Sequence, residues 1–294
     1  MERAEPSPTT PPSPSALAPG LYVTATPIGH ARDITLRALD VLKGCDVIAA
    51  EDTRVTAKLL AIYGIAKPLV AYNDHNAARE RPRLIARLKT GQCVALVSDA
   101  GTPLVSDPGF KLVREAIAED VRVEAIPGAS ALLTALVLAG LPSDRFLFAG
   151  FLSPRSGERR NALAELKPIP ASLVFFESPN RLGECLADMA DMLGPRTAAV
   201  GRELTKLHEE VRRGTLAALA SGYANEETPR GEVTIVVGPP PDEAPDTARI
   251  DSLLRQALAF MPVRAAADLV AEALDAPRRT VYARALDLKA DEDA

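Results

Sequence analysis

The chain has little of what marks several common protein classes. None of its 294 residues is tryptophan, aromatic residues make up 4%, and there are three cysteines and three histidines. Cys45, Cys93 and Cys185 lie far apart with no Cys-x-x-Cys, so we expect buried thiols in a reducing compartment. The histidines are isolated from one another, which predicts that no metal is bound.

Two phosphate-binding signatures are also missing. The chain contains no Gly-x-Gly and no Gly-Lys-Ser/Thr, the cores of the dinucleotide-binding and P-loop motifs. NAD enzymes and P-loop NTPases are therefore disfavoured. Any nucleotide-like ligand must be held by a different turn chemistry.

Excess positive charge and a membrane span are absent as well. The net charge of −5 gives no global field that attracts nucleic acid, so RNA binding would need a local basic patch. Residues 125–143 carry no charge, but prolines and glycines limit the helix there to 129–139, shorter than the roughly 20 residues that cross a bilayer. The N-terminus shows no secretory signal, and we expect a cytoplasmic protein with no membrane partner.

What the chain does have is a regular alternation of apolar runs and helical patterns. Residues 1–19, rich in proline, serine and threonine, predict a disordered tail. The alternation after them predicts an α/β fold with two α/β domains, 20–127 and 128–238, and mainly parallel strands. The expected strands are 21–25, 47–50, 69–71, 94–97 and 121–126, then 146–149, 173–176, 198–200 and 233–237.

The last part of the chain differs in character. A proline-rich linker is expected over 239–248, followed by a small helical module over 249–290. Its three helical patterns, 249–260, 263–274 and 278–288, have a helix-turn-helix character. A plain packing module and a nucleic-acid reader are equally compatible with this pattern.

Polar residues follow several expected strands at their carboxyl ends, where open α/β sheets bind ligands. Asp99 follows the strand 94–97, and Asp107 with Pro108 is expected to start the next helix. Glu51-Asp-Thr-Arg54 follows 47–50; a helix cap would use only one of these residues, and Arg54 in a first turn opposes the helix dipole, so we favour a functional role. Ser130 is expected to cap a helix whose amide groups face a ligand.

These turns occur in a recognisable order, and the chain resembles the tetrapyrrole methylase superfamily over about 21–238. Within it, the closer similarity is to the bacterial branch that methylates the ribose 2′-hydroxyl of a cytidine in 16S rRNA of the small ribosomal subunit. The helical module resembles the C-terminal module of that branch. His30 stands where the branch usually has asparagine, and Asn180 where it usually has histidine. The motifs are Thr26-Pro-Ile-Gly29, Glu51-Asp-Thr-Arg54, Ser98–Gly109, Pro127-Gly-Ala-Ser130, Phe176-Glu-Ser-Pro179 and Arg202-Glu-Leu-Thr-Lys206.

The resemblance implies S-adenosylmethionine bound in a cofactor cleft between the two α/β domains, and a homodimer. Leu104, Leu152 and Phe176 are candidates for an apolar slot that takes the adenine. Carried over to this chain, the cofactor contacts fall on Pro27, Asp99, Gly101, Thr102, Pro103, Leu104, Ser130, Ala131, Phe176, Gly231 and Glu232.

Transfer to a ribose hydroxyl would need a base or a cation that stabilises the alkoxide. Asp52, Glu209 and Lys206 are the candidates, with Arg54 and Arg181 as positioning groups. RNA phosphates are expected to contact a basic patch and the helical module, which makes binding dependent on salt. That patch comprises Arg155, Arg159, Arg160, Arg181, Arg202, Lys206, Arg212 and Arg213.

Two other functions are compatible with the fold. One is a methyltransferase acting on a tetrapyrrole or another small molecule. The other is a non-catalytic ribosome-assembly factor that keeps a relic of the cofactor pocket. The turn motifs and the helical module favour the RNA-modifying branch over the first, and the intact Asp99 region argues against the second.

Overall fold

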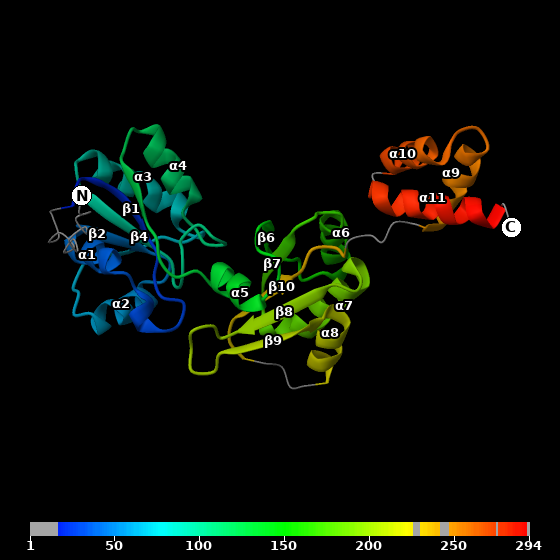
Figure 1. Ribbon diagram of the computed structural model, residues 1–294. Helices are drawn as coiled ribbons and strands as arrows, with labels where there is room; N and C mark the ends of the chain where they lie inside the picture. Colours follow the sequence, from blue (N-terminus) through cyan, green and yellow to red (C-terminus); the bar gives the residue numbers. More distant parts are fainter. Residues whose placement is uncertain (1–16, 226–229, 242–246, 275, 293–294) are drawn as a thin grey trace, which may run out of the picture. The chain divides into compact units, whose positions relative to one another are not determined.

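The computed structural model describes residues 17–225, 230–241, 247–274 and 276–292, which form two compact units divided between Pro239 and Pro240 (Figure 1). The first unit contains two β-sheets and their helices, and the second contains three helices. Most of the expected tail, 1–19, and part of the expected linker, 239–248, lie outside the described residues.

The first sheet is entirely parallel, in the order β3-β2-β4-β1-β5. Neighbouring residues of a strand face opposite sides, so Ile48 packs with α1 and α2 whereas Val47 packs with α3 and α4. Figure 1 shows these helix pairs on either side of the sheet. The elements are β1 (Gly20–Thr24), η1 (Ala31–Asp33), α1 (Leu36–Gly44), β2 (Val47–Ala50), α2 (Thr53–Ile62), β3 (Leu69–Ala71), α3 (Ala77–Lys89), β4 (Cys93–Val97), α4 (Phe110–Ala118) and β5 (Val123–Ile126).

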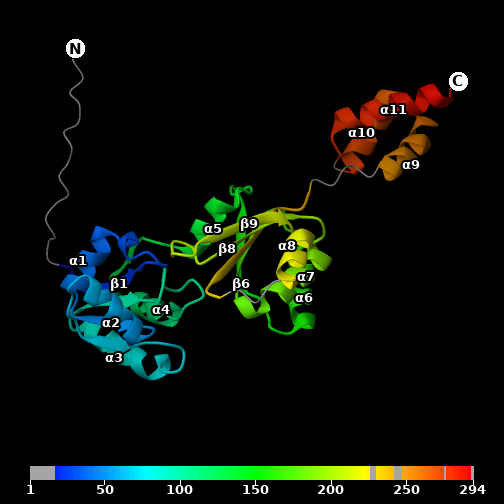
Figure 2. The same cartoon turned by 90° about the horizontal axis from the view of Figure 1, so that it is seen from below.

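The second sheet is mixed, in the order β6-β7-β10-β8-β9, and only its β6–β7 pair is parallel. The helix α5 packs on one face, and α6, α7 and α8 pack on the other (Figure 2). The elements are α5 (Ala131–Ala139), β6 (Phe146–Phe151), α6 (Ser156–Leu166), β7 (Ser172–Glu177), η2 (Pro179–Arg181), α7 (Leu182–Leu193), β8 (Thr197–Arg202), β9 (Glu210–Thr215), α8 (Leu216–Ala224) and β10 (Val233–Val237).

The predicted α/β fold is confirmed, but the expectation of mainly parallel strands holds only for the first sheet. The strand β9 was not expected, because its sequence Glu-Val-Arg-Arg-Gly-Thr has a polar composition that does not indicate a buried strand. It lies at the edge of the second sheet and pairs only with β8 among the described strands. An edge strand needs one partner and tolerates exposed charges.

The helical unit consists of α9 (Thr247–Leu258), α10 (Val263–Ala273) and α11 (Arg278–Glu292). Leu254, Ala267 and Val281, one from each helix, are fully buried in a common core. The three helices occupy the ranges expected from the sequence within a few residues at each end. No described helix is long and apolar enough to cross a membrane.

Candidate active site

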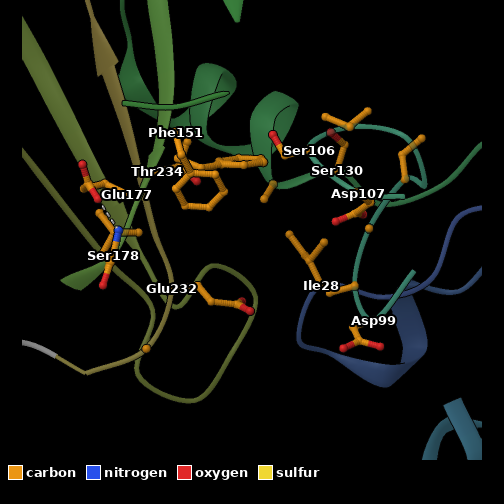
Figure 3. A pocket seen from close by; sticks show the side chains of 18 of the residues that line it. Ile28, Asp99, Ser106, Asp107, Ser130, Phe151, Glu177, Ser178, Glu232 and Thr234 are labelled. Carbon is orange, nitrogen blue, oxygen red and sulfur yellow. Dashed lines mark hydrogen bonds between the residues drawn. The ribbon is translucent and has the colours of Figure 1, made fainter. Parts of the chain in front are cut away.

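A cavity of about 370 Å³ lies where strands of the first sheet end and faces residues of the second sheet (Figure 3). Its volume is in the range of small-molecule sites. The lining residues are Ile28, Glu51, Asp99, Ala100, Gly101, Thr102, Val105, Ser106, Asp107, Ser130, Ala131, Phe151, Phe176, Glu177, Ser178, Pro179, Gly231, Glu232, Val233 and Thr234.

The loop after β4 forms one side of the cavity. Its Gly101 pairs with Thr26 through two backbone hydrogen bonds of 2.8 and 3.0 Å, which fix it to the end of β1. Leu104 and Ser106 have φ of 74° and 65°, a conformation that costs free energy for residues with a side chain. The loop is therefore held in its shape by contacts to the sheet.

Asp107 does not start the next helix, so the prediction that it is an N-cap is wrong. The helix α4 begins at Phe110, after Gly109 at φ 138°, a backbone angle that favours glycine. Asp107 and Pro108 stay in the loop, and Asp107 lines the cavity. The side chain that the sequence assigned to capping is thereby available to a ligand.

Glu51, Asp99 and Asp107 together form what we call the acid wall of the cavity. The Asp52 amide donates to Asp99 at 2.9 Å, and the Asp99 amide donates to Glu51 at 3.4 Å. Burial raises the pKa of all three carboxyls, that of Asp107 to about 6. Like charges near one another in a partly dry site add to this effect.

The opposite wall is aromatic and comes from the second sheet. Phe176 of β7 packs against Phe148 and Phe151 of β6, with ring centroids 4.8 and 5.7 Å away. A bulge in β6 between Phe148 and Gly150 shifts the alternation of side chains. Phe151 therefore lines the cavity, whereas Leu152, expected there, is buried in the core of the second sheet.

The N-terminus of α5 also reaches the cavity. Ser130 caps this helix as expected, accepting from the Leu133 amide at 3.5 Å. The Thr102 hydroxyl donates to the Ala129 carbonyl at 3.2 Å and ties the loop after β4 to this turn. Ser130 and Ala131 both line the cavity.

The structure brings together most of the residues expected to contact a cofactor. Pro27 lies in an adjoining hollow instead, and Pro103 and Leu104 are absent from the cavity lining. The expected contacts that do line the cavity are Asp99, Gly101, Thr102, Ser130, Ala131, Phe176, Gly231 and Glu232.

Asp52 and Arg54 lie beside the cavity in a polar hollow that they share with Glu51 and Asp99. Asp52 caps α2 and accepts from the Arg54 amide at 2.8 Å, while the Arg54 guanidinium pairs with its carboxylate at 2.6 Å. These hydrogen bonds lower the pKa of Asp52 to about 2. The capping role is thus present, and the guanidinium is an additional feature that capping does not require.

Lys206 lies in the loop between β8 and β9, away from Asp52 and Arg54. It pairs with Glu203 and Glu232 at 2.8 Å each, and Glu232 lines the cavity. Burial lowers the pKa of Lys206, but the bonds to these two carboxylates outweigh it and leave the pKa raised. Glu209 instead accepts from the Thr205 amide at 2.6 Å and so stabilises the loop that carries Lys206.

Most of the expected RNA-binding arginines are exposed or half-buried, but Arg159 is not. It is 1% exposed and pairs with Asp188 at 2.6 Å between α6 and α7, so the prediction that it binds RNA is wrong. The sequence could not distinguish it from its neighbour Arg160, which is half-buried and pairs with Asp188 and Asp191.

The remaining members of that group also have protein partners. Arg181 pairs with the buried Glu177 at 2.5 Å. Arg155 pairs with Glu158, Arg202 and Arg212 pair with Glu210, and Arg213 donates to the Leu138 carbonyl.

The fold and the cavity define an α/β protein with two sheets in one compact unit, whose ligand site has an aromatic wall, an acid wall and a helix N-terminus. Comparison with known sequences identifies the family. The chain belongs to the tetrapyrrole (corrin/porphyrin) methylases, whose family profile matches residues 20–220. A second profile, the RsmI C-terminal HTH domain, matches residues 244–289. The family expected from the turn motifs is confirmed.

Relatives named "Ribosomal RNA small subunit methyltransferase I" match nearly the whole chain. The protein from Mesorhizobium japonicum is 54% identical, over 93% of each chain. The one from Erythrobacter litoralis is 50% identical, over 93% of this chain and 96% of the relative.

Solved structures show the same fold. Uroporphyrin-III-C-methyltransferase from Thermus thermophilus is 25% identical, with a TM-score of 0.55 over 74% of this chain and 93% of its own. Diphthine synthase is 20% identical, with a TM-score of 0.58 over 74% of this chain and 89% of its own.

Proposed function

We propose that this protein is an S-adenosylmethionine-dependent methyltransferase that modifies RNA of the small ribosomal subunit. The observation that carries the proposal is the cavity itself, with its aromatic wall, acid wall and helix N-terminus, in a chain whose 54%-identical relative is named for that activity. A homodimer in the cytoplasm, where its ribosomal target lies, is part of the proposal.

The residues of the cavity fit this cofactor. Phe151 and Phe176 offer an apolar aromatic surface for the adenine, and the N-terminus of α5 suits the carboxylate of the methionine part. Carboxylates such as Asp99 can accept hydrogen bonds from the ribose hydroxyls and the ammonium. When bound, the cofactor supplies an activated methyl group.

We further propose that the acceptor is the ribose 2′-hydroxyl of a cytidine in 16S rRNA. The support is the ordered set of turn motifs shared with the branch that carries out this reaction. A hydroxyl is a weak nucleophile at neutral pH, so the protein must align it and stabilise negative charge on its oxygen.

Lys206 is the candidate that the contacts favour for this charge stabilisation. Its raised pKa keeps the ammonium protonated, and its pair with Glu232 places it next to the cavity. Asp52 is a weak base because its pKa is about 2, so we assign it with Arg54 to positioning the acceptor. Glu209 supports the loop that holds Lys206.

Single-turnover rates test these assignments. We expect Lys206→Ala to lower the methylation rate roughly a hundredfold, comparable to the loss of one charge-stabilising donor. Asp52→Ala should lower it less, and saturating cofactor in both assays separates a loss of rate from a change in cofactor affinity. If both variants keep the full rate, the assignments are wrong.

RNA contact by the helical unit is supported by a hollow of about 460 Å³ lined by Arg264, Arg278, Arg279 and Tyr282. Cations beside an aromatic ring suit phosphates and a stacked base. We expect Arg264→Ala with Arg279→Ala to weaken binding to small subunits about tenfold and to reduce its dependence on salt. An affinity unchanged between low and moderate salt would contradict this role.

The reaction is tested by methyl transfer from labelled S-adenosylmethionine. We expect label on isolated small subunits and none on uroporphyrinogen. Mapping ribose methylation on rRNA from cells with and without the gene then identifies the nucleotide. Transfer to uroporphyrinogen alone would favour the small-molecule function, and no transfer to either would favour an assembly factor. Sedimentation of the purified protein tests the homodimer.

A further inference from the structure

All ionisable side chains that line the described cavity are acids. They are Glu51, Asp99, Asp107, Glu177 and Glu232. Glu177 is paired with Arg181, and Glu232 shares the ammonium of Lys206 with Glu203. Among the described residues, the structure records no ion pair for the three carboxylates of the acid wall. Arg54, which is paired with Asp52, acts on Asp99 from the adjoining hollow, and no such cation is found for Glu51 or Asp107 among the described residues. The cavity therefore carries a net negative charge.

Asp107 is the member of the acid wall whose hydrogen bond is with a side chain, that of Ser98, and not with a backbone amide. Asp99 and Glu51 each accept from a backbone amide and help to hold neighbouring loops. No amide hydrogen bond is recorded for Asp107 in the described part of the chain, and its carboxyl points into the cavity in Figure 3. Its charge is thus directed at whatever occupies the cavity.

Charge is also what distinguishes the methyl donor from its product. On transfer, the carbon–sulfur bond breaks, a carbon–oxygen bond forms, and the hydroxyl proton passes from the acceptor to solvent water. The donor changes from a sulfonium cation to a neutral thioether, while its adenosine, ammonium and carboxylate stay the same. A negative cavity therefore attracts the donor more strongly than the product.

We propose that the acid wall, chiefly through Asp107, selects the sulfonium donor over the thioether product. This inference rests on the proposed function and adds to it a residue that determines specificity. The carboxylates of the wall attract the positive charge of the sulfonium, and methyl transfer removes that charge from the ligand. The neutral product therefore binds more weakly and dissociates from the cavity.

Equilibrium binding to the full chain, followed by calorimetry, tests the proposal. The ligands are S-adenosylmethionine, S-adenosylhomocysteine and the analogue with a protonated amine in place of the sulfonium. We expect Asp107→Asn to weaken binding of both cations roughly tenfold, with less than about a twofold change for the thioether. Asp107→Glu, which keeps the charge, should keep the preference for cations.

A matched control is available at Asp120. It is exposed in the loop after α4 and has φ 54°, a conformation that asparagine also tolerates. Asp120→Asn removes the same charge away from the cavity and should leave all three affinities unchanged. Circular dichroism checks that each variant is folded.

The affinity for the donor should also depend on pH. Because a bound cation favours ionised carboxyls, lowering the pH from 7.5 to 5 should weaken donor binding in the wild type and do so less in Asp107→Asn. Asp107 is faced by Glu51, Asp99 and Ser98 on its own side and by the paired Glu177 and Glu232 across the cavity. The thioether should show little dependence on pH.

Two outcomes would overturn the proposal while leaving the proposed function intact. Asp107→Asn could weaken donor and product equally, which would mean that it contacts a part common to both. It could also leave all affinities unchanged, which would mean that its charge does not act on the ligand. Absence of binding by the wild type would instead contradict the proposed function itself.

Discussion

The acid wall and the core beside the second sheet differ in whether their carboxylates have cationic partners. Around the second sheet Arg159 pairs with Asp188 at 2.6 Å and Arg181 pairs with Glu177 at 2.5 Å, so each of these two buried carboxylates has a cationic partner from the chain. The carboxylates of the acid wall make no ion pair with the described residues, and Arg54, which acts on Asp99, is itself paired with Asp52. Because burial makes an unpaired charge costly, the first arrangement stabilises the fold, and the second leaves a place for a cationic ligand.

Removing a paired charge should give the largest effect. Arg159→Ala leaves the buried Asp188 without its closest partner, and we expect it to lower the free energy of unfolding by roughly 3 kcal/mol. Thermal or urea denaturation measures this loss. Arg155→Ala is the matched control, because that side chain is 80% exposed and its removal should change stability by less than about 0.5 kcal/mol. Equal losses would mean that burial of the pair is not what matters.

Changing the aromatic wall should affect donor and product alike. Phe176→Leu keeps an apolar side chain but removes the ring, and we expect it to weaken binding of both S-adenosylmethionine and S-adenosylhomocysteine roughly tenfold. The equal loss contrasts with the selective loss predicted for Asp107→Asn. Phe260→Leu, at an 88% exposed position in the helical unit, is the control. A selective effect of Phe176→Leu would remove the distinction between the two walls.

Unpaired charge should lower the stability of the protein without ligand. Burial, followed by the nearby Glu51 and Asp99, raises the folded-state pKa of Asp107 to about 6 from 3.8. The folded protein therefore binds more protons than the unfolded chain between these values, and stability falls as the pH rises through this window.

Asp107→Asn should remove the contribution of Asp107 to this decrease in stability with rising pH. We expect the variant to be more stable than the wild type at pH 7 by about 1 kcal/mol, an amount reduced because the group is only half-buried. At pH 5 the difference should shrink. Melting temperatures at the two pH values, with Asp120→Asn alongside, provide the measurement; a variant less stable at pH 7 would contradict the unbalanced charge.

The smallest effect is expected at a paired carboxylate of the same cavity. Glu232 is 71% exposed and pairs with Lys206, so Glu232→Gln should change the ratio of donor to product affinity by less than about twofold. Calorimetry with both ligands measures the ratio. A tenfold change would show that pairing within the protein does not cancel the attraction of a carboxylate for the donor.

Much of the fold was predictable because it depends on local patterns. The expected strands 47–50, 69–71 and 233–237 coincide with β2, β3 and β10, since buried strands read as short apolar runs between turns. The cap at Ser130 was predictable for the same local reason. The edge strand β9 was not predictable, because its polar sequence carries no strand pattern and its pairing with β8 alone forms it.

The candidate site was predictable only in part. Asp99 and Glu51 follow strands whose carboxyl ends share one edge of a parallel sheet, so their meeting follows from strand order. Phe151 was missed because a bulge in β6 changed which side chains face the cavity. Asp107 was assigned to a helix cap that Gly109 provides instead.

The sequence by itself determined the family, the α/β alternation and the turns that carry the polar residues, because these depend on short segments of chain. Only the tertiary structure decided which charges are paired. Arg159 meets Asp188 from a different helix, and Asp107 meets carboxylates from the ends of two strands. The free energy of a charge depends on burial and on partners distant in sequence. The same residue types therefore stabilise the core beside the second sheet and form an acid wall at the end of the first.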